Sequence, residues 1–381
     1  MKSLREIVES SPRMRAAVSH GLHPEQTPQP LGSSRWDWAD VNRVLVIRLR
    51  SIGDTVLTTP SLIALRRFLP KVQLDVLLES WVAPVLEGFE HIDHVVRLER
   101  GSTTARLQLA REIRAANYDV VYNLHGGTTA TLLSRATGAR HRVGFAHYQY
   151  SRLHNHLAPS SLELWSVPKA HSVEQQLALI GWTGVPVSDK PGTQLTVTGS
   201  AAASTSSKLS AAGIQDGTRF AMIHPAAAFA TKQWAVEKYA RVVDALHDLG
   251  LASVALAAPS EAALLNELKN KSAAHLVTLS DLSLPEVTAL ASRARLFVGN
   301  DSGIAHIAAA VNAPSVVIFG SSNVAHWRPW SNAAAEVVLE EMDCQPCHGY
   351  FCEKFSQPEC ILRVPGHRVI AAIERVVKES A

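Results

Sequence analysis

Short apolar runs alternate with amphipathic stretches along most of the chain. Residues 43–48 form an apolar, β-branched run that is typical of a buried parallel strand. In the segment that follows, Thr59 is the predicted helix cap, and Leu62, Leu65 and Leu69 fall on one helical face. A strand followed by an amphipathic helix and then by another apolar run predicts parallel βαβ units.

The same alternation continues in two stretches of the chain. In the first stretch we expect strands at 72–78, 95–98 and 119–124 and a helix at 104–117. In the second we expect strands at 220–224, 252–257, 276–278, 296–298 and 315–319, with helices at 235–249, 261–271, 284–292 and 303–310. A final helix at 366–378 carries an apolar face that we expect to pack back on the first stretch.

These patterns predict an α/β protein with two Rossmann-like domains that face each other across a cleft. A chain of 381 residues is long enough for two domains of about 150 residues each. We expect the domains at 41–185 and 200–345, joined by a linker rich in Gly, Pro, Ser and Thr, with a cysteine-containing segment and helix at 344–381. Residues 1–40 are polar and contain several prolines, so we expect a flexible extension outside the fold.

The composition indicates an ordinary globular protein. Hydrophobic residues make up 46% and charged residues 19% of the chain, and no apolar run approaches the roughly 20 residues of a transmembrane helix. The N-terminal segment lacks the apolar run of a secretory signal, so we expect a cytoplasmic protein. A net charge of +3 is too small to indicate a nucleic acid partner, although it suits anionic substrates and peripheral contact with the inner face of an anionic membrane.

Candidate chemistry lies at the ends of the predicted strands, where ligands bind in open α/β sheets. No G-x-G-x-x-G motif follows either opening strand, which argues against a dinucleotide oxidoreductase. Just after the first strand, Gly53 permits a close approach of backbone or substrate, and Asp54 is placed to accept a proton from an attacking hydroxyl group. A carboxylate at this position would equally well cap the helix, and both interpretations remain open.

Two further segments lie in the second domain. Residues 299–303 join a strand to an Ala-rich helix that carries His306, and the free backbone N–H groups of such a turn can bind a diphosphate. In this turn Asp301 is a candidate to cap the helix or to hold a ribose hydroxyl. Lys232, in the loop after strand 220–224, is a candidate to neutralise a leaving nucleoside diphosphate without a metal ion, although an isolated lysine is more often a solvated surface residue.

In their combination and order, these segments resemble glycosyltransferase family 9, the ADP-heptose:lipopolysaccharide heptosyltransferases. The resemblance covers residues 43–329. It is carried by the segments 43–48, 51–60, 232–234 and 298–306, followed by 319–322 and Trp327, with lesser marks at 119–125, 142–144 and 171–174.

The resemblance implies a GT-B fold and an inverting transfer that requires neither a metal ion nor another cofactor. It implies that Asp54 deprotonates an acceptor hydroxyl, that Lys232 binds the donor phosphates, and that four residues hold the donor diphosphate: Asp301, Ser302, Gly303 and His306. The donor would be ADP-heptose or a related nucleotide sugar, and the acceptor a lipopolysaccharide core or a similar lipid-linked or oligosaccharide glycan. Arg48 and Arg50 are candidates to contact acidic groups of that acceptor or to pair with surface carboxylates.

The cysteines form a separate candidate site. All four lie in one short span, at Cys344, Cys347, Cys352 and Cys360, with His348 beside them. This position excludes disulfide stapling of the main body. In a reducing compartment the cluster is compatible with a structural zinc ion or with a regulatory or structural group of thiols. We expect His348 to be a bystander and no catalytic metal at this place.

Two alternative functions remain open. A sugar-nucleotide epimerase would share the two-domain architecture but would need acid and base residues around the donor sugar, and no such set stands out. A catalytically inactive protein that binds glycans or nucleotides would keep the cleft, but it would not need Asp54, Lys232 and Asp301 together.

Overall fold

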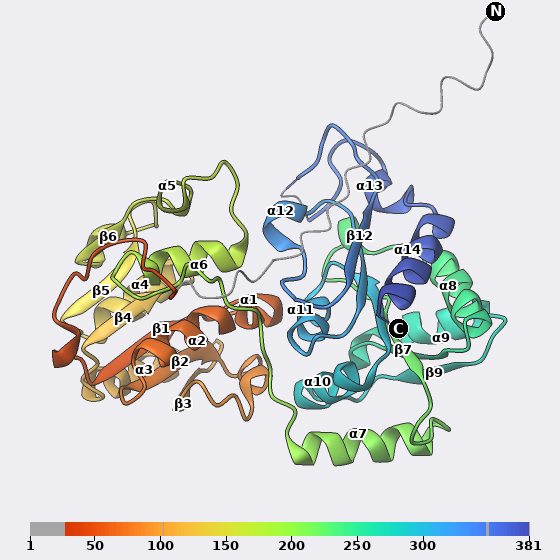
Figure 1. The fold of residues 1–381 in the computed structure, drawn as a ribbon, viewed down its shortest axis with the longest axis horizontal. Helices are drawn as coiled ribbons and strands as arrows, with labels where there is room; N and C mark the ends of the chain where they lie inside the picture. The colour runs from red at the N-terminus through yellow and green to blue at the C-terminus, as the bar shows by residue number, and fades with distance from the viewer. Residues whose placement is uncertain (1–26, 102, 348–349, 381) are drawn as a thin grey trace, which may run out of the picture.

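The computed structural model of the protein describes residues 27–101, 103–347 and 350–380. Two parallel six-stranded sheets lie side by side, each with helices on both faces (Figure 1). The first sheet has the strand order β3-β2-β1-β4-β5-β6 and the second the order β12-β11-β10-β7-β8-β9. Each order reverses beside the opening strand of its sheet, which is where open α/β sheets bind their ligands.

The strands are mostly the apolar runs of the sequence. The first sheet contains β1 (Arg43–Ile47), β2 (Gln73–Glu79), β3 (His94–Leu98), β4 (Val120–Asn123), β5 (His141–Phe145) and β6 (His156–Ala158). The second contains β7 (Phe220–His224), β8 (Ala252–Leu256), β9 (Leu276–Leu279), β10 (Leu296–Asn300), β11 (Ser315–Phe319) and β12 (Ala335–Leu339). Every strand expected from the sequence is present, with its ends within about two residues of the expected ones, which is the usual uncertainty of such boundaries.

The helices complete both domains. The first domain carries α1 (Ile52–Val56), α2 (Thr59–Phe68), α3 (Thr103–Ala115), α4 (Thr128–Ala136), α5 (Ser161–Trp165) and α6 (Ser172–Gly181), and α7 (Gly199–Ala211) follows the linker. The second carries α8 (Val236–Asp248), α9 (Ala262–Lys271), α10 (Leu284–Arg293), α11 (Gly303–Ala310), α12 (Val324–Trp327), α13 (Glu359–Leu362) and α14 (Gly366–Glu379).

Alternate side chains of β1 enter two different cores. Val44 and Val46 are fully buried in the core that includes residues of α2 and α6. Leu45 and Ile47 are fully buried in the core that includes residues of α3 and α4. Because both faces are covered, β1 has no polar position along its buried length, as is usual for a central parallel strand.

The start of α2 differs from the expectation by one residue. Thr58, not Thr59, occupies the cap position, and Thr59 is the first helical residue. The reason is the short helix α1, which turns directly into α2. The Thr58 hydroxyl donates to the backbone oxygen of Asp54 at 2.8 Å. It therefore binds to α1 and makes no capping hydrogen bond to α2.

The final helix packs on the second domain, so the expectation that it returns to the first domain was wrong. α14 contacts α8, β11 and β12, and Val369, Ile373 and Val376 lie in the core of that side. The apolar spacing identifies the buried face of α14 correctly. It carries no information about which surface the face will meet.

Several elements were not expected from the sequence, namely α1, α4, α5, α6, α7, β5, β6, β12 and the short helices α12 and α13. β5 and β6 lie at or next to the edge of the first sheet, and they carry His, Arg and Gly where a central strand is continuously apolar. α7 is rich in Ser and Ala, and its start is fixed by Thr198, whose Oγ1 accepts a hydrogen bond from the backbone N–H of Ala201 at 3.3 Å.

Residues 27–40 pack against the first domain, in contrast to the expected flexible extension. The backbone N–H of Leu31 donates to Gly181 at 3.0 Å, and the indole N–H of Trp38 donates to the carbonyl of Thr183 at 3.3 Å. Trp36 and Trp38 also pack on the core. Residues 1–26 of the expected extension lie outside the described residues.

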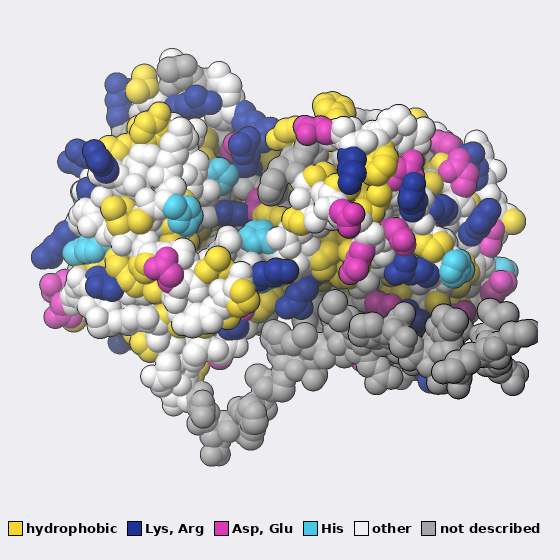
Figure 2. Space-filling model, turned by 90° about the horizontal axis from the view of Figure 1, so that it is seen from above, with side chains coloured by type: hydrophobic (Ala, Val, Ile, Leu, Met, Phe, Trp, Pro, Cys, Tyr) yellow, Lys and Arg dark blue, Asp and Glu magenta, His cyan; other side chains and the backbone are white. Residues whose placement is uncertain are grey.

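The two domains differ in surface charge. Figure 2 shows Lys and Arg side chains gathered over the first domain, at the left of the view, whereas on the second domain they are interspersed with Asp and Glu. None of the helices in the described part of the chain combines the length and the apolar character needed to cross a bilayer.

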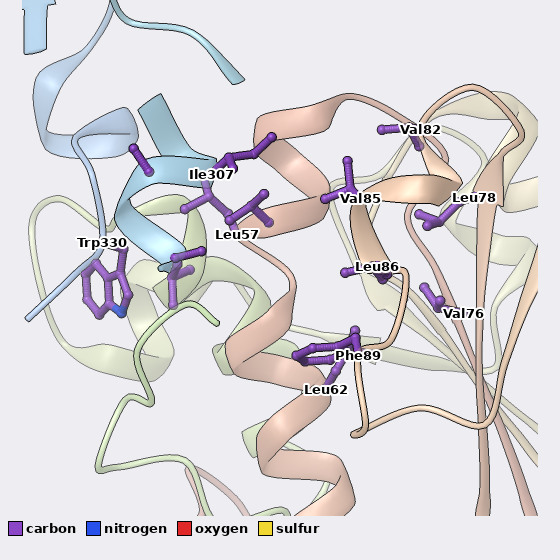
Figure 3. Close-up of a cluster of buried hydrophobic side chains, with 14 of the residues drawn as sticks. Leu57, Leu62, Val76, Leu78, Val82, Val85, Leu86, Phe89, Ile307 and Trp330 are labelled. Atoms are coloured by element: carbon purple, nitrogen blue, oxygen red, sulfur yellow. The ribbon is translucent and has the colours of Figure 1, made fainter. Parts of the chain in front are cut away.

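The two domains share part of one core. α1 of the first domain contacts α11 of the second, and one cluster of buried side chains includes Leu57, Val85, Ile307 and Trp330. Figure 3 shows Ile307 of α11 beside Leu57 in the turn after α1, with Val85 nearby. The segments that carry the candidate site residues therefore meet at a packed junction.

Candidate functional site

Asp54 lies on α1, just after the carboxyl end of β1. Its Oδ2 accepts hydrogen bonds from the backbone N–H and the hydroxyl of Ser51 at 3.3 and 3.1 Å, so the carboxylate caps the short helix. Its Oδ1 accepts a hydrogen bond from Arg48 in an ion pair. The cap is confirmed and uses one carboxylate oxygen, while the role of general base stays a prediction.

The surroundings of Asp54 keep it ionised. Burial raises the pKa of the carboxyl group, but the charge of Arg48 and the hydrogen bonds from Arg48 and Ser51 outweigh burial, and the pKa lies below its usual value of 3.8. The side chain keeps 20% of its surface accessible. Asp54 therefore presents a proton-free carboxylate that is partly accessible to solvent.

Lys232 and Asp301 come together from two loops at the carboxyl edge of the second sheet. Lys232 ends the short helix η4 (Ala230–Lys232), and its Nζ lies 2.8 Å from Oδ2 of Asp301. Ser322, after β11, donates a hydrogen bond to the same oxygen. The Asp301 side chain is 5% exposed and that of Lys232 24%, so the ammonium group retains access for a second anion.

The start of α11 adjoins this pair. Ser302 is the cap residue, but its side chain makes no capping hydrogen bond, and its Oγ lies 3.3 Å from Nδ1 of His224 instead. The interpretation of Asp301 as the cap was therefore wrong, because its carboxylate is bound to Lys232. The first turn of this eight-residue helix is left with N–H groups and a positive dipole end for an anion.

Two glycines let α1 and α11 approach each other. A Cβ atom at Gly53 would lie 2.7 Å from Cδ2 of His306, and one at Gly303 would lie 2.8 Å from Cβ of Ile52. Side chains do not pack at such distances, so both positions need glycine. His306 is 4% exposed, and its pKa is lowered because burial outweighs the nearby carboxylates, which leaves a neutral ring between the two halves of the site.

Gly53→Val is expected to destabilise the protein by about 2–3 kcal/mol, because an extra branched side chain in a packed contact forces the His306 ring and the backbone apart. Urea unfolding monitored by tryptophan fluorescence measures the change. Gly199→Val is the matched control, since the space around Gly199 is open and its backbone is ordinary. Equal midpoints for both variants would show that the contact between α1 and α11 is not tight.

Two histidines that the sequence did not single out also join the domains here. Nδ1 of His326, on α12, lies 3.1 Å from the carbonyl of Ala170, and the charge of Asp54 acts on its ring, although burial lowers the pKa overall. Nε2 of His171 lies 2.8 Å from the carbonyl of Arg328. A signal for His171 existed, because 171–174 is one of the lesser family marks, whereas nothing in the sequence marked His326.

The two candidate acceptor arginines differ in their surroundings. Arg48 is 11% exposed and donates to Asp54 and to the carbonyl of Leu124, so it pairs with a carboxylate of the site itself. Arg50 is exposed. Burial lowers the pKa of His125 to about 4, and the charges of Arg48 and Arg50 act in the same direction. The Nδ1 of His125 is buried and unpaired among the described residues. The charge of Asp54 also acts on this ring.

The cysteine segment packs around the Lys232 loop. The backbone N–H of Cys347 donates to Ser321 at 3.0 Å, and Cys360 lies on α13, which contacts η4. All four cysteines are free, and within the described ranges no three His, Cys, Asp or Glu side chains form a group that could hold a metal ion. His348 lies outside the described residues. The segment thus supports the Lys232 loop through packing.

Comparison with known proteins identifies the family of the chain. The model of a family described as glycosyltransferase family 9 (heptosyltransferase) matches residues 106–355. Lipopolysaccharide heptosyltransferase 3 of Escherichia coli is 29% identical over 348 residues, which cover 87% of this chain and 98% of that protein.

Solved structures show the same arrangement of domains. The family 9 glycosyltransferase of Veillonella parvula has a TM-score of 0.77 at 22% identity, with 89% of this chain and 97% of that chain covered. The ADP-heptose lipopolysaccharide heptosyltransferase II of Escherichia coli has a TM-score of 0.73 at 21% identity, with 89% and 100% covered. The predicted two-domain GT-B fold is thereby confirmed. Because the family model spans well over half of the chain, the protein belongs to glycosyltransferase family 9 and is a glycosyltransferase.

Proposed function

We propose that the protein transfers a heptose, or a related sugar, from ADP-heptose to a lipopolysaccharide core or a similar glycan, with inversion at the anomeric carbon. The names of its relatives support the sugar, the nucleotide and the acceptor. The observation that carries the proposal is the junction of α1 and α11, which assembles Asp54 of one domain and the Lys232–Asp301 pair of the other around His306.

Asp54 acts on the acceptor. Its carboxylate takes the proton of an acceptor hydroxyl while that oxygen forms a bond to the anomeric carbon of the donor. In the same step the bond between the anomeric carbon and the β-phosphate oxygen breaks, and ADP leaves from the opposite face of the sugar, so the configuration inverts. Arg48 holds the carboxylate ionised until the proton arrives.

Lys232 and α11 act on the donor. Negative charge develops on the β-phosphate as its bond to the sugar breaks, and the Lys232 ammonium group and the N–H groups at the start of α11 stabilise it. Asp301 fixes the position of Lys232 Nζ at 2.8 Å. Ser302 and Gly303 form the turn that faces the phosphates. The ring of His306 is neutral, so it offers the donor a nitrogen atom for a hydrogen bond and no positive charge.

We assign acceptor binding to the first domain, residues 41–185, and donor binding to the second, residues 200–345. Arg50 lies near Asp54 on the first domain and suits acidic groups of the acceptor, while the His125 ring, which its low pKa keeps neutral, can donate a hydrogen bond to them. We place the enzyme in the cytoplasm, the compartment that supplies nucleotide-activated sugars.

We propose that catalysis needs no metal ion or other cofactor, because charged side chains and a helix start can take the place of Mg²⁺ at the diphosphate. The four cysteines keep a structural zinc ion or a thiol role open. Metal analysis of the purified protein decides between these two roles. If the protein contains no stoichiometric zinc, the role as a group of thiols is the one that remains.

Calorimetric titration with ADP, UDP, GDP and NAD in the presence of EDTA tests the donor. We expect ADP to bind at least tenfold more tightly than the other nucleotides, a difference of about 1.4 kcal/mol. A preference for UDP or GDP would point to another donor sugar, and a preference for NAD would overturn the assignment of the reaction.

A further inference from the structure

We propose that one rim of the first domain docks on an anionic lipid bilayer. The rim lies along the carboxyl edge of the first sheet, and its apolar part consists of Trp81, Leu107, Leu132 and Tyr150. The inference goes beyond the proposed transfer reaction and rests on it in one respect only, which is that the acceptor is carried by a lipid.

The four apolar side chains of the rim are exposed to solvent. Leu107, Leu132 and Tyr150 are 55%, 54% and 57% exposed, and Trp81 is 43% exposed. A single exposed leucine is ordinary on a protein surface. Four large apolar side chains along one edge need a different explanation, because contiguous apolar surface usually marks a place of contact.

These side chains belong to neighbouring elements. Trp81 follows β2 and Tyr150 follows β5, so both lie at the carboxyl edge of the sheet. Leu107 and Leu132 stand in the second turns of α3 and α4, two helices that begin at this edge and contact each other. Tyr150 precedes the short helix η3 (Ser151–Leu153), which contacts α4. The four side chains therefore stand on elements that follow one another along this edge.

Positive charge borders this rim. Residues 120–162 contain four arginines but no aspartate or glutamate. Arg135 on α4 and Arg152 on η3 are exposed on elements that carry the rim, whereas Arg140 precedes β5 at the opposite edge. The guanidinium of Arg100, which is paired with Glu79, lies 5.0 Å from the ring of Trp81. Figure 2 shows Lys and Arg side chains gathered over the first domain, to which this stretch belongs.

An anionic bilayer matches both properties of the rim. Leucine side chains enter the interface, tryptophan and tyrosine are favoured at the headgroup level, and arginines are attracted to anionic headgroups. Asp54 follows β1, in the middle of the same edge. Docking along the rim would thus bring the headgroup of a lipid-borne acceptor toward the carboxylate that deprotonates it.

Sedimentation of the full-length protein with phosphatidylcholine vesicles, with and without phosphatidylglycerol, tests the proposal. We expect the protein to sediment with the anionic vesicles only. The double variant Leu107→Asp, Leu132→Asp should partition into them at least about tenfold less, because it adds two negative charges and removes two apolar contacts. Leu249→Asp is the matched control on the second domain, where Leu249 is 37% exposed.

The double variant should keep its rate of transfer to a delipidated, soluble acceptor, which also shows that it is folded. Equal sedimentation of the wild type and the double variant would overturn the proposal, as would a wild type that binds no anionic vesicles. Binding only to vesicles that contain the lipid acceptor would overturn it too, by assigning the affinity to the acceptor site. If the proposed transfer itself were wrong, the wild type would fail on the soluble acceptor whatever its sedimentation.

Discussion

Asp54→Asn is expected to lower kcat for sugar transfer by about a hundred- to ten-thousandfold, the usual contribution of a general base. Asparagine has the shape of aspartate and can still accept a hydrogen bond from Ser51, but its amide cannot take up the hydroxyl proton. Because we assign ADP binding to the other domain, its affinity should stay within about twofold, which is less than 0.5 kcal/mol. Steady-state kinetics and calorimetry on the same preparation separate the two effects.

The control for this variant is Asp93→Asn. Asp93 also pairs with an arginine, Arg66, at 2.6 Å, but the pair lies away from the junction of α1 and α11. An Asp54→Asn enzyme with the kcat of the wild type would sink the assignment of the base. The pH profile gives a second check. Because the pKa of Asp54 is lowered, its carboxylate stays ionised as the pH falls through about 5, and activity due to this group is lost only near or below 3.8.

Lys232→Ala is expected to weaken ADP binding by about 10- to 100-fold, the equivalent of about 1.5–3 kcal/mol for a hydrogen bond to a charged group. Transfer should slow as well, because the departing diphosphate loses its counter-charge. Part of the lost ADP affinity has a second cause. Asp301 is 5% exposed, and without Lys232 its buried carboxylate would repel the phosphates.

The double variant Lys232→Ala, Asp301→Ala separates these two contributions. It should bind ADP more tightly than Lys232→Ala alone, since the unpaired carboxylate is gone. Lys271→Ala is the control, because Lys271 is an ion-paired surface lysine at the far end of α9. ADP affinity that is unchanged in Lys232→Ala would remove the lysine from the donor site.

The local parts of the fold could be predicted from the sequence. β7, β11 and α11 form at the expected residues, because each is a continuous apolar or Ala-rich run between turn residues, and such runs determine structure locally. The candidate residues also occupy the expected strand ends. Since carboxyl ends of parallel strands share one edge, Lys232 and Asp301 were expected to lie in one region, and they form an ion pair there.

The contacts between elements that are far apart in the sequence could not be predicted. The pairing of Arg48 with Asp54, the contact of His306 with Gly53 and the docking of α14 all depend on how finished elements meet, which no periodicity encodes. The same holds for β5 and β6. β6 is the edge strand and β5 is its neighbour, and strands in these places have polar positions, so their pattern resembles that of a loop until the neighbouring strand is known.

The segment that joins the two domains is bound to both of them. Thr193 donates to the carbonyl of Trp330 at 2.6 Å, the indole of Trp330 donates to Pro191 at 3.0 Å, and the backbone N–H of Gln194 donates to Thr59 at 3.1 Å. A connection rich in Gly, Pro, Ser and Thr thus works as a rigid strap instead of a loose tether. If acceptor and donor bind the two domains as we propose, the strap fixes the orientation of their two sites relative to each other. The entropy of orienting the two binding sites is then lost when the chain folds, and only the entropy of the sugars themselves is lost at each turnover.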